Sequence, residues 1–280
     1  MKVVALHAIR ESVRRRVFAV VLALSVVFLG LYAWGTNELF DDVGGFAGNE
    51  FGVEAETVAG ATVLGLGMFA ILFLGAVLAT FLTHGAVRGD ADSGLLQPLI
   101  VRPLGRTAYV GGRLLAAGTV SALYAMVLFG GCVVITGLAG WWPDRVLAPM
   151  LGLAGATVVI AALSLLGSVL LSATANGIAV FMVFGAGLIA GLLGQIGEAL
   201  SSETLTSISD VATWVLPFEA LYQDGLALLT ADVGGTTEAI VTLGPFGGAQ
   251  DSGALLYPFA VVYVAAVFAA AAALFARRDL

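Results

Sequence analysis

Charged residues, cysteine and lysine are all scarce in this sequence of 280 residues. Only 11% of the residues are charged, against about 25% in a typical soluble domain, and the mean hydropathy is +1.02. One soluble core cannot hide that much apolar surface, which excludes an ordinary soluble protein. The single cysteine, Cys132, lies inside an apolar run, so a disulfide framework and a thiolate metal site are excluded as well.

The shortage of lysine bears on the use of ATP. A P-loop needs a lysine after its glycines to reach the terminal phosphates, and the only lysine is Lys2. The chain therefore cannot carry this motif, and any ATP hydrolysis must take place in a partner. No set of catalytic, metal-binding or cofactor-binding residues stands out, so we expect neither an enzyme nor a cofactor, and no nucleic-acid partner.

Long apolar stretches are what the sequence has instead. A helix needs about 20 apolar residues to cross the hydrocarbon layer of a bilayer. Six stretches qualify and contain no Asp, Glu, Lys, Arg or His: residues 17–34, 58–82, 114–138, 147–171, 178–196 and 255–276. A charge in mid-helix would cost about 2.5–3.5 kcal/mol. The sequence thus predicts an all-α integral membrane protein with six transmembrane helices, forming one domain over residues 1–280.

The basic residues predict the orientation. Eleven of the 12 Lys and Arg residues fall on one side of the six-span arrangement, and only Arg145 falls on the other. The positive-inside rule places both termini and the loop at 84–113 in the cytoplasm of a multi-pass cell-membrane protein. Of the 19 acidic residues, 15 lie outside. This acidic surface suits either very salty surroundings or the collection of cations.

Two segments outside the spans have helical spacing of apolar residues. Residues 1–16 predict an amphipathic helix lying along the inner leaflet, or a simple basic anchor. The extracellular segment 197–254 repeats apolar residues every three or four positions from Leu205, until Pro217 interrupts the pattern. We expect two short re-entrant helices here, with Pro217 in the first turn of the second helix. A passive extracellular cap is the alternative.

The loop at 84–113 carries the most distinctive motif. Asp90 and Asp92 precede Gly94 and an apolar patch, and a run from Arg102 to Arg106 follows. Two carboxylates without histidines or further acids make a poor metal site. Apolar anchors beside charged residues instead suit a surface that binds a cytoplasmic partner.

This loop resembles the signature of the ABC type-2 transporter permeases, in which Glu-Arg-Glu-x-Gly-Thr-Leu is followed by apolar residues, Pro-(Val/Leu)-Ser-Arg and Gly-Lys or Gly-Arg. The matching positions here are Asp90, Asp92, Gly94, Pro103, Arg106, Gly112 and Arg113. The departures are Asp for both Glu residues, Ala91 for Arg, Leu95 for Thr and Gly105 for Ser. The N-terminal segment 9–14, the outer segment 217–222 and the ending at 275–279 also resemble the family.

The resemblance implies a permease subunit that pairs with a second permease subunit and works with a separate ATP-binding cassette ATPase subunit. It implies partner coupling through Glu11, Arg14, Asp90, Asp92, Gly94, Pro103 and Arg106. It also implies an outer gate shaped by Pro217, Phe218 and Glu219. The transported substrate is not indicated.

Other classes remain as alternatives. A membrane scaffold without transport fits the same composition. An intramembrane protease would need a base near Ser164 or Ser168, but both histidines lie in cytoplasmic segments, and a lipid-headgroup transferase would need more acids than Asp90 and Asp92. Gly187 and Gly191 stand four apart in the fifth span, a spacing that lets another helix approach closely, as at a dimer contact.

Overall fold

The computed structural model describes residues 16–44, 55–87, 105–229, 253 and 255–277. Within these ranges the chain forms eight α-helices and no strand. Their bounds are α2 Arg16–Gly44, α3 Ala55–Thr83, α6 Arg106–Ala139, α7 Leu147–Leu170, α8 Ala173–Ala199, α9 Glu203–Val215, α10 Pro217–Leu229 and α12 Leu256–Ala276. The predicted all-α fold class is therefore confirmed.

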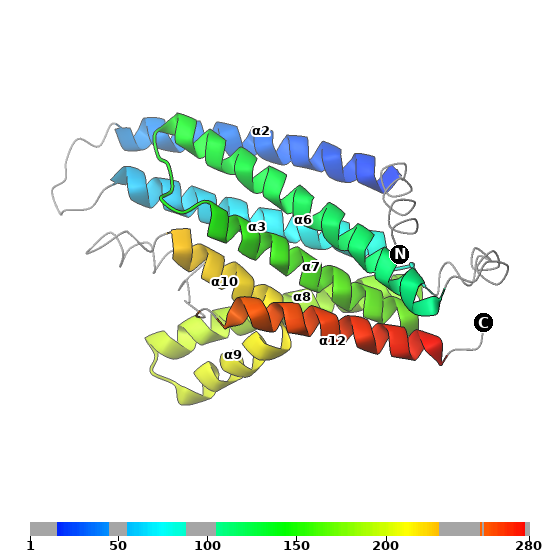
Figure 1. The fold of residues 1–280 in the computed structure, drawn as a ribbon. Coiled ribbons are helices and arrows are strands. Elements are labelled where there is room, and N and C mark those ends of the chain that lie inside the picture. Colours follow the sequence, from blue (N-terminus) through cyan, green and yellow to red (C-terminus); the bar gives the residue numbers. More distant parts are fainter. Residues whose placement is uncertain (1–15, 45–54, 88–104, 230–252, 254, 278–280) are drawn as a thin grey trace.

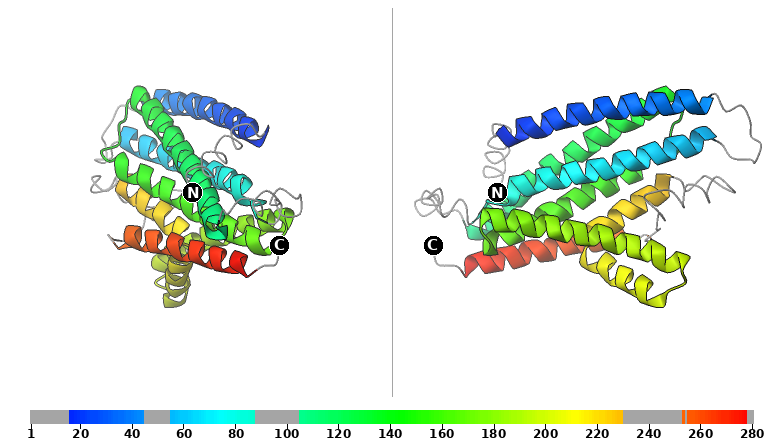
Figure 2. Two further views of the ribbon diagram at one scale, coloured as in Figure 1. Left: turned by 45° about the vertical axis from the view of Figure 1, so that its right-hand side comes forward. Right: turned by 180° about the vertical axis from the view of Figure 1, so that it is seen from behind.

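Six of these helices, α2, α3, α6, α7, α8 and α12, are long and apolar enough to cross a membrane, as predicted. They run alternately up and down along one bundle, so the start of α2 and the end of α12 lie at the same end (Figures 1 and 2). We call this the termini end. The opposite end, where α8 joins α9, is the hairpin end.

The helices extend beyond the apolar stretches that predicted them. The first continues ten residues past the predicted end at Trp34, through Asp41 and Asp42, to Gly44. The third begins at Arg106 rather than at residue 114, so the last part of the predicted 84–113 loop is helical. Backbone hydrogen bonds continue a helix into water once it is nucleated, whereas the apolar count marks only the part that suits hydrocarbon.

The centre of the bundle is formed by α3 and α7. Two thirds of their apolar windows are buried (67% each), against 22% for α2 and α12, which present most of their surface outward. Small residues bring the two central helices together: a Cβ atom on Gly75 would lie 2.5 Å from Cγ2 of Thr157. A hydrogen bond between the hydroxyl groups of Tyr32 and Thr136, at 2.7 Å, ties α2 to α6.

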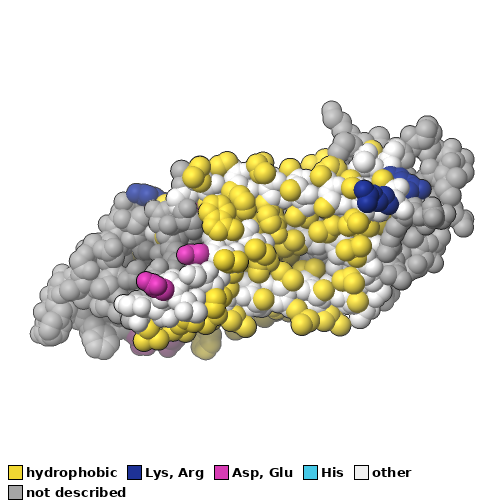
Figure 3. All heavy atoms as spheres, turned by 90° about the horizontal axis from the view of Figure 1, so that it is seen from below, with side chains coloured by type: hydrophobic (Ala, Val, Ile, Leu, Met, Phe, Trp, Pro, Cys, Tyr) yellow, Lys and Arg dark blue, Asp and Glu magenta, His cyan; other side chains and the backbone are white. Residues whose placement is uncertain are grey.

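The outer surface of the bundle matches the expectation for a membrane protein. On the face seen in Figure 3, apolar side chains cover the middle, basic side chains gather at the termini end, and acidic side chains lie at the hairpin end together with a smaller basic patch. A solvated surface of this kind would be costly, whereas lipid would cover it without penalty. The separation of charge agrees with the positive-inside prediction, and the direction in which the bundle crosses the membrane stays a prediction.

The two short helices form a hairpin at the side of the bundle. From the end of α8, α9 runs back toward the middle of the bundle, and α10 returns to the hairpin end (Figures 1 and 2). Each helix has 13 residues and spans about 20 Å, too short to cross a hydrocarbon layer of about 30 Å. The two predicted helices and the break at Pro217 are present, while their entry into the outer leaflet stays a prediction.

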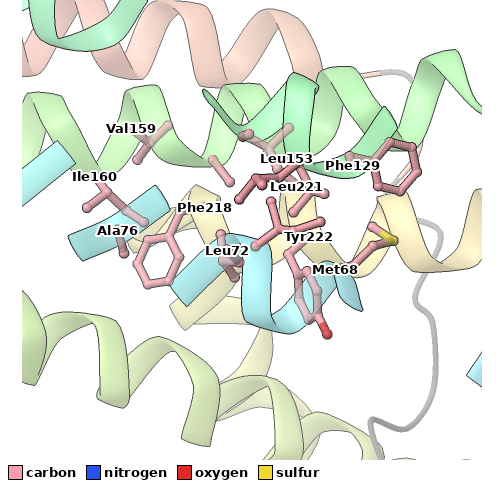
Figure 4. Packing of buried hydrophobic residues seen from close by; sticks show 14 of the residues in the cluster. Met68, Leu72, Ala76, Phe129, Leu153, Val159, Ile160, Phe218, Leu221 and Tyr222 are labelled. Atoms are coloured by element: carbon pink, nitrogen blue, oxygen red, sulfur yellow. The ribbon is translucent and has the colours of Figure 1, made fainter. Parts of the chain in front are cut away.

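The two helices of the hairpin differ in burial. Among the residues of α9 only Ser209 is buried, and Ile208, Val211 and Trp214 are exposed apolar residues. By contrast α10 contacts α3, α7, α8, α9 and α12 and contributes to the main hydrophobic core. Its core side chains interleave with those of α3 and α7, as the close view of Phe218, Leu221 and Tyr222 shows (Figure 4).

Candidate functional site

Most of the predicted partner-coupling residues lie outside the described part of the chain. These are Glu11, Arg14, Asp90, Asp92, Gly94 and Pro103. The exception is Arg106, the first residue of α6, which lies at the termini end. The structure also describes the residues on both sides of the 88–104 segment, which join this segment to the bundle.

Arg106 joins the start of α6 to the end of α12. Its Nη1 atom donates hydrogen bonds to the carbonyl oxygens of Phe275, at 3.4 Å, and Ala276, at 2.9 Å. Its guanidinium carbon lies 5.9 Å from the centroid of the Phe275 ring. The last carbonyls of a helix lack partners and carry partial negative charge, so a guanidinium is well suited to this position. A displacement of the α6 start would therefore be transmitted to α12.

A second contact holds the other side of the segment, where α3 ends in a turn. Tyr109 of α6 donates a hydrogen bond from its hydroxyl to the carbonyl oxygen of Ala86 at 2.7 Å. The amide nitrogen of Asn176 donates to the carbonyl oxygens of Ser164, at 2.8 Å, and His84, at 3.2 Å. Asn176 thus connects the start of α8 with α7 and the end of α3.

Asn176 was missed by the sequence reasoning. A fully buried asparagine between two apolar spans is a recognisable signal, because its amide must find partners that hydrogen-bond it. Sequence alone does not say that these partners are carbonyl groups from two other segments. The result is a termini end in which α3, α6, α7, α8 and α12 are joined by specific polar contacts.

The predicted outer-gate residues lie at the turn of the hairpin. Pro217 is the first residue of α10, the first-turn position that the sequence predicted. The turn is attached to α12: the Tyr263 hydroxyl donates a hydrogen bond to the carbonyl oxygen of Val215 at 2.8 Å. The rings of Trp214 and Phe259 meet edge to face with their centroids 4.7 Å apart. These contacts hold the turn against α12 at an exposed flank of the bundle.

Phe218 anchors the start of α10 in the core. Its side chain is fully buried, and its ring stacks on that of Phe184 of α8, with a centroid separation of 5.7 Å and an interplanar angle of 15°. A Cβ atom on Gly187 would lie 2.5 Å from Cζ of Phe218, so the ring occupies the space that the missing side chain leaves. The close approach expected of Gly187 is therefore made by α10 of the same chain.

Glu219 is buried on the same side of α10. Its Oε1 atom accepts a hydrogen bond from Nε2 of Gln223 at 2.9 Å and lies against Gly191, where a Cβ atom would clash. Its Oε2 atom and the Oε1 atom of Gln223 have no hydrogen-bond partner among the described residues. Burial raises the pKa of Glu219 to about 7, and the hydrogen bond from Gln223 lowers it in part.

A small cavity lies beside this carboxyl group, between α8, α9 and α10. The volume within it that the centre of a water molecule can occupy is about 10 Å³. Besides Glu219 and Gln223, its lining is made of small residues: Gly187, Ala190, Gly191, Ser209, Ala212, Thr213 and Ala220. We call Glu219, Gln223 and this cavity the Glu219 site.

A second buried acid on α10, Asp224, accepts a hydrogen bond from α12. The hydroxyl of Tyr257 of α12 donates a hydrogen bond to Oδ2 of Asp224 at 2.8 Å. Neither Gln223 nor Asp224 was predicted as a site residue, because a polar residue in a short amphipathic helix is ordinarily placed on its solvated face. The described residues contain no group of three or more metal-ligating side chains.

Comparison with known proteins gives one clear result. The family described as ABC-2 family transporter protein matches residues 2–280, which is almost the whole chain. A comparison with curated proteins gives no match. The family match agrees with the six apolar helices and with the order of motifs along the sequence. The chain therefore belongs to the ABC-2 family of transporter proteins.

Proposed function

We propose that this chain is the permease subunit of an ATP-driven transporter of the cell membrane. In this proposal it pairs with a second permease subunit, and a separate ATP-binding cassette subunit supplies the energy. The observation that carries the proposal is the family match over residues 2–280, found in a chain that folds into a bundle of six apolar helices. The substrate is left open because the described residues suggest none.

The termini end is where we place the ATPase subunit. The proposed coupling segment contains Asp90 and Asp92 and is followed directly by α6, whose first residue, Arg106, is bonded to the end of α12. On its other side the turn after α3 is bonded to Asn176 of α8. Motion of an ATPase against this segment would reach α3, α6, α8 and α12 together, which supports a coupling role.

The charge reversal Asp92→Lys tests this placement. We expect it to weaken co-purification of the ATPase subunit by at least about tenfold, since truncating or reversing a buried interfacial charge costs about 2–5 kcal/mol. The matched control is Asp210→Lys on α9, an exposed acid at the hairpin end, which should bind the ATPase normally. Normal co-purification and ATP-driven transport by Asp92→Lys would contradict the coupling role of the segment.

The orientation can be tested with a pair of threonines. Thr204 on α9 and Thr107 on α6 are both exposed and lie at opposite ends of the bundle. On a Cys132→Ala background, a membrane-impermeant thiol reagent added outside intact cells should label Thr204→Cys and not Thr107→Cys. Permeabilised cells, in which both should react, are the control. Labelling of both positions in intact cells would exclude the proposed topology.

We place the outer gate at the hairpin of α9 and α10. The support is mechanical: α10 is buried in the core on both faces and is joined at its start to the exposed helix α9, so a movement of the hairpin would change the packing of the core. The turn rests on α12 through Tyr263, and Arg106 holds the other end of α12. One helix therefore contacts both the proposed coupling end and the proposed gate.

A further inference from the structure

Among the residues that the structure describes, none supplies a positive charge to the Glu219 site. The helices that pack against α10 are α3, α7, α8, α9 and α12, and none of them contains Lys, Arg or His. The same is true of α10 itself. A carboxylate taken out of water without a cationic partner is so unfavourable that it is neutralised instead. The missing charge must therefore come from a proton or from a bound cation.

The other titratable groups near α10 do not change this conclusion. Asp224 accepts its hydrogen bond from Tyr257 of α12, and Glu203 and Asp210 of α9 are exposed. Tyr222 and Tyr263 can each donate a hydrogen bond but are neutral. Of the remaining acids, Glu56 is exposed at the start of α3, and Glu198 lies about two turns beyond Gly191 in α8. Of the residues whose side chains are described, Asp224, Glu203, Asp210, Tyr222, Tyr263 and Glu56 do not line the cavity.

The atoms of the site favour the proton. Glu219 presents one unpartnered acceptor, Oε2, and Gln223 presents another, Oε1, beside a cavity with room for about one water molecule. A protonated Oε2 could donate into this cavity, where one water would carry the hydrogen bond onward. A divalent ion would need more carboxylates, and a hydrated ion or an organic cation would not fit.

We propose that Glu219 is a proton-binding site, which takes up one proton when α10 packs against α8 and releases it when this contact opens to water. Oε2 forms the O–H bond, and the proton returns to solvent when the carboxylate becomes hydrated. Packing of α10, and with it the position of the hairpin, thereby depends on pH. The site belongs to the folded chain alone, so it holds or fails independently of the proposed transport function.

Infrared difference spectroscopy of the full chain in lipid nanodiscs tests the proposal directly. We expect a C=O stretching band of a protonated carboxyl group that disappears as the pH rises through about 7, well above the usual range of a glutamic acid. Glu219→Gln should remove this band, and Asp210→Asn, which changes an exposed acid of α9, should leave it in place.

A second variant tests the proposal even if Glu219→Gln fails to fold. In Gln223→Leu the carboxylate loses its hydrogen-bond donor while Glu219 is retained, so the band should persist to higher pH than in the wild type. The thermal midpoint of the wild-type chain should fall as the pH rises from about 4.5 to about 7, because over this range the folded state keeps the proton that the unfolded state has lost. Both variants change only this side of α10.

Three results would overturn the proposal. The first is a wild-type carboxyl band that Glu219→Gln leaves unchanged. The second is a titration in Gln223→Leu that moves to lower pH or not at all. The third is displacement of the band by added NaCl at constant pH together with a rise in thermal midpoint, which would assign the site to a metal cation. A band that is the same in NaCl and in choline chloride of matched ionic strength supports a bound proton.

Discussion

Phe218→Ala is expected to lower the free energy of unfolding by about 3–5 kcal/mol, the range observed when a buried phenylalanine is truncated. The effect should be large because Phe218 is fully buried and fixes the start of α10 against α8 by stacking on Phe184. Denaturant unfolding of the purified chain in detergent micelles measures it. Trp214→Ala, at a position 51% exposed on α9, is the aromatic control and should cost much less.

A partner substitution shows whether the effect comes from this contact. Gly187→Leu places a side chain where the Phe218 ring lies, and overpacking of this kind costs about 1–3 kcal/mol. Gly185→Leu, on the same helix with nothing within 4 Å of its added Cβ atom, should be nearly neutral. In the double variant Gly187→Leu with Phe218→Ala, the leucine should fill part of the space left by the ring.

The double-mutant cycle shows whether Gly187 and Phe218 interact. If Gly187 and Phe218 share one packing site, the two costs should fall short of additivity by at least about 1 kcal/mol. Strict additivity within about 0.5 kcal/mol would mean that α10 does not pack against α8 as described. An equal loss in Gly185→Leu would point to a general intolerance of α8 for larger side chains.

The number and order of the long helices could be predicted because hydrocarbon imposes a length and excludes charge. Stretches such as 58–82 and 147–171 therefore stand out against any alternative. Helix ends were less predictable. The apolar stretch ends at Trp34, yet α2 continues through Asp41 and Asp42, because charged residues are tolerated in a helix once it has left the hydrocarbon.

The role of α10 shows what apolar spacing cannot convey. The sequence predicted a short helix beginning at Pro217, and it singled out Phe218 and Glu219. Apolar spacing alone suggests a helix with one solvent-exposed face, whereas both faces of α10 are buried. This burial depends on Gly187 and Gly191 of α8, whose missing side chains leave room for Phe218 and Glu219. Such a fit between two helices is a property of their docking, which no local pattern encodes.

The same reasoning applies to polar anchors. Arg106 was predicted from its place in the loop motif, and its contact with α12 arises because two helix ends distant in sequence meet at one end of the bundle. Asn176 belongs to no motif, and its role in joining helices follows only from its hydrogen bonds to the carbonyl groups of Ser164 and His84. The side chains that join helices were thus the hardest to predict from the sequence.

Ala220→Cys is expected to become reactive only when the proposed gate opens. Ala220 is 3% exposed and lines the cavity of the Glu219 site, so a small water-soluble thiol reagent should reach it slowly in the resting bundle. If the hairpin moves away from α8 during the ATP cycle, the cavity wall opens and the thiol meets water. The background is Cys132→Ala, since Cys132 is itself buried.

The measurement compares the labelling rate in the assembled complex with and without MgATP. Ala156→Cys, in the middle of α7 and completely buried, is the matched control and should stay unreactive in both conditions. We expect at least about a tenfold faster reaction at position 220 with MgATP, which corresponds to a shift of about 1.4 kcal/mol toward the open state. This readout needs no knowledge of the substrate. Equal rates with and without MgATP in a complex that hydrolyses ATP would make the hairpin a fixed cap, because a hairpin that moves must expose the wall against which it packs.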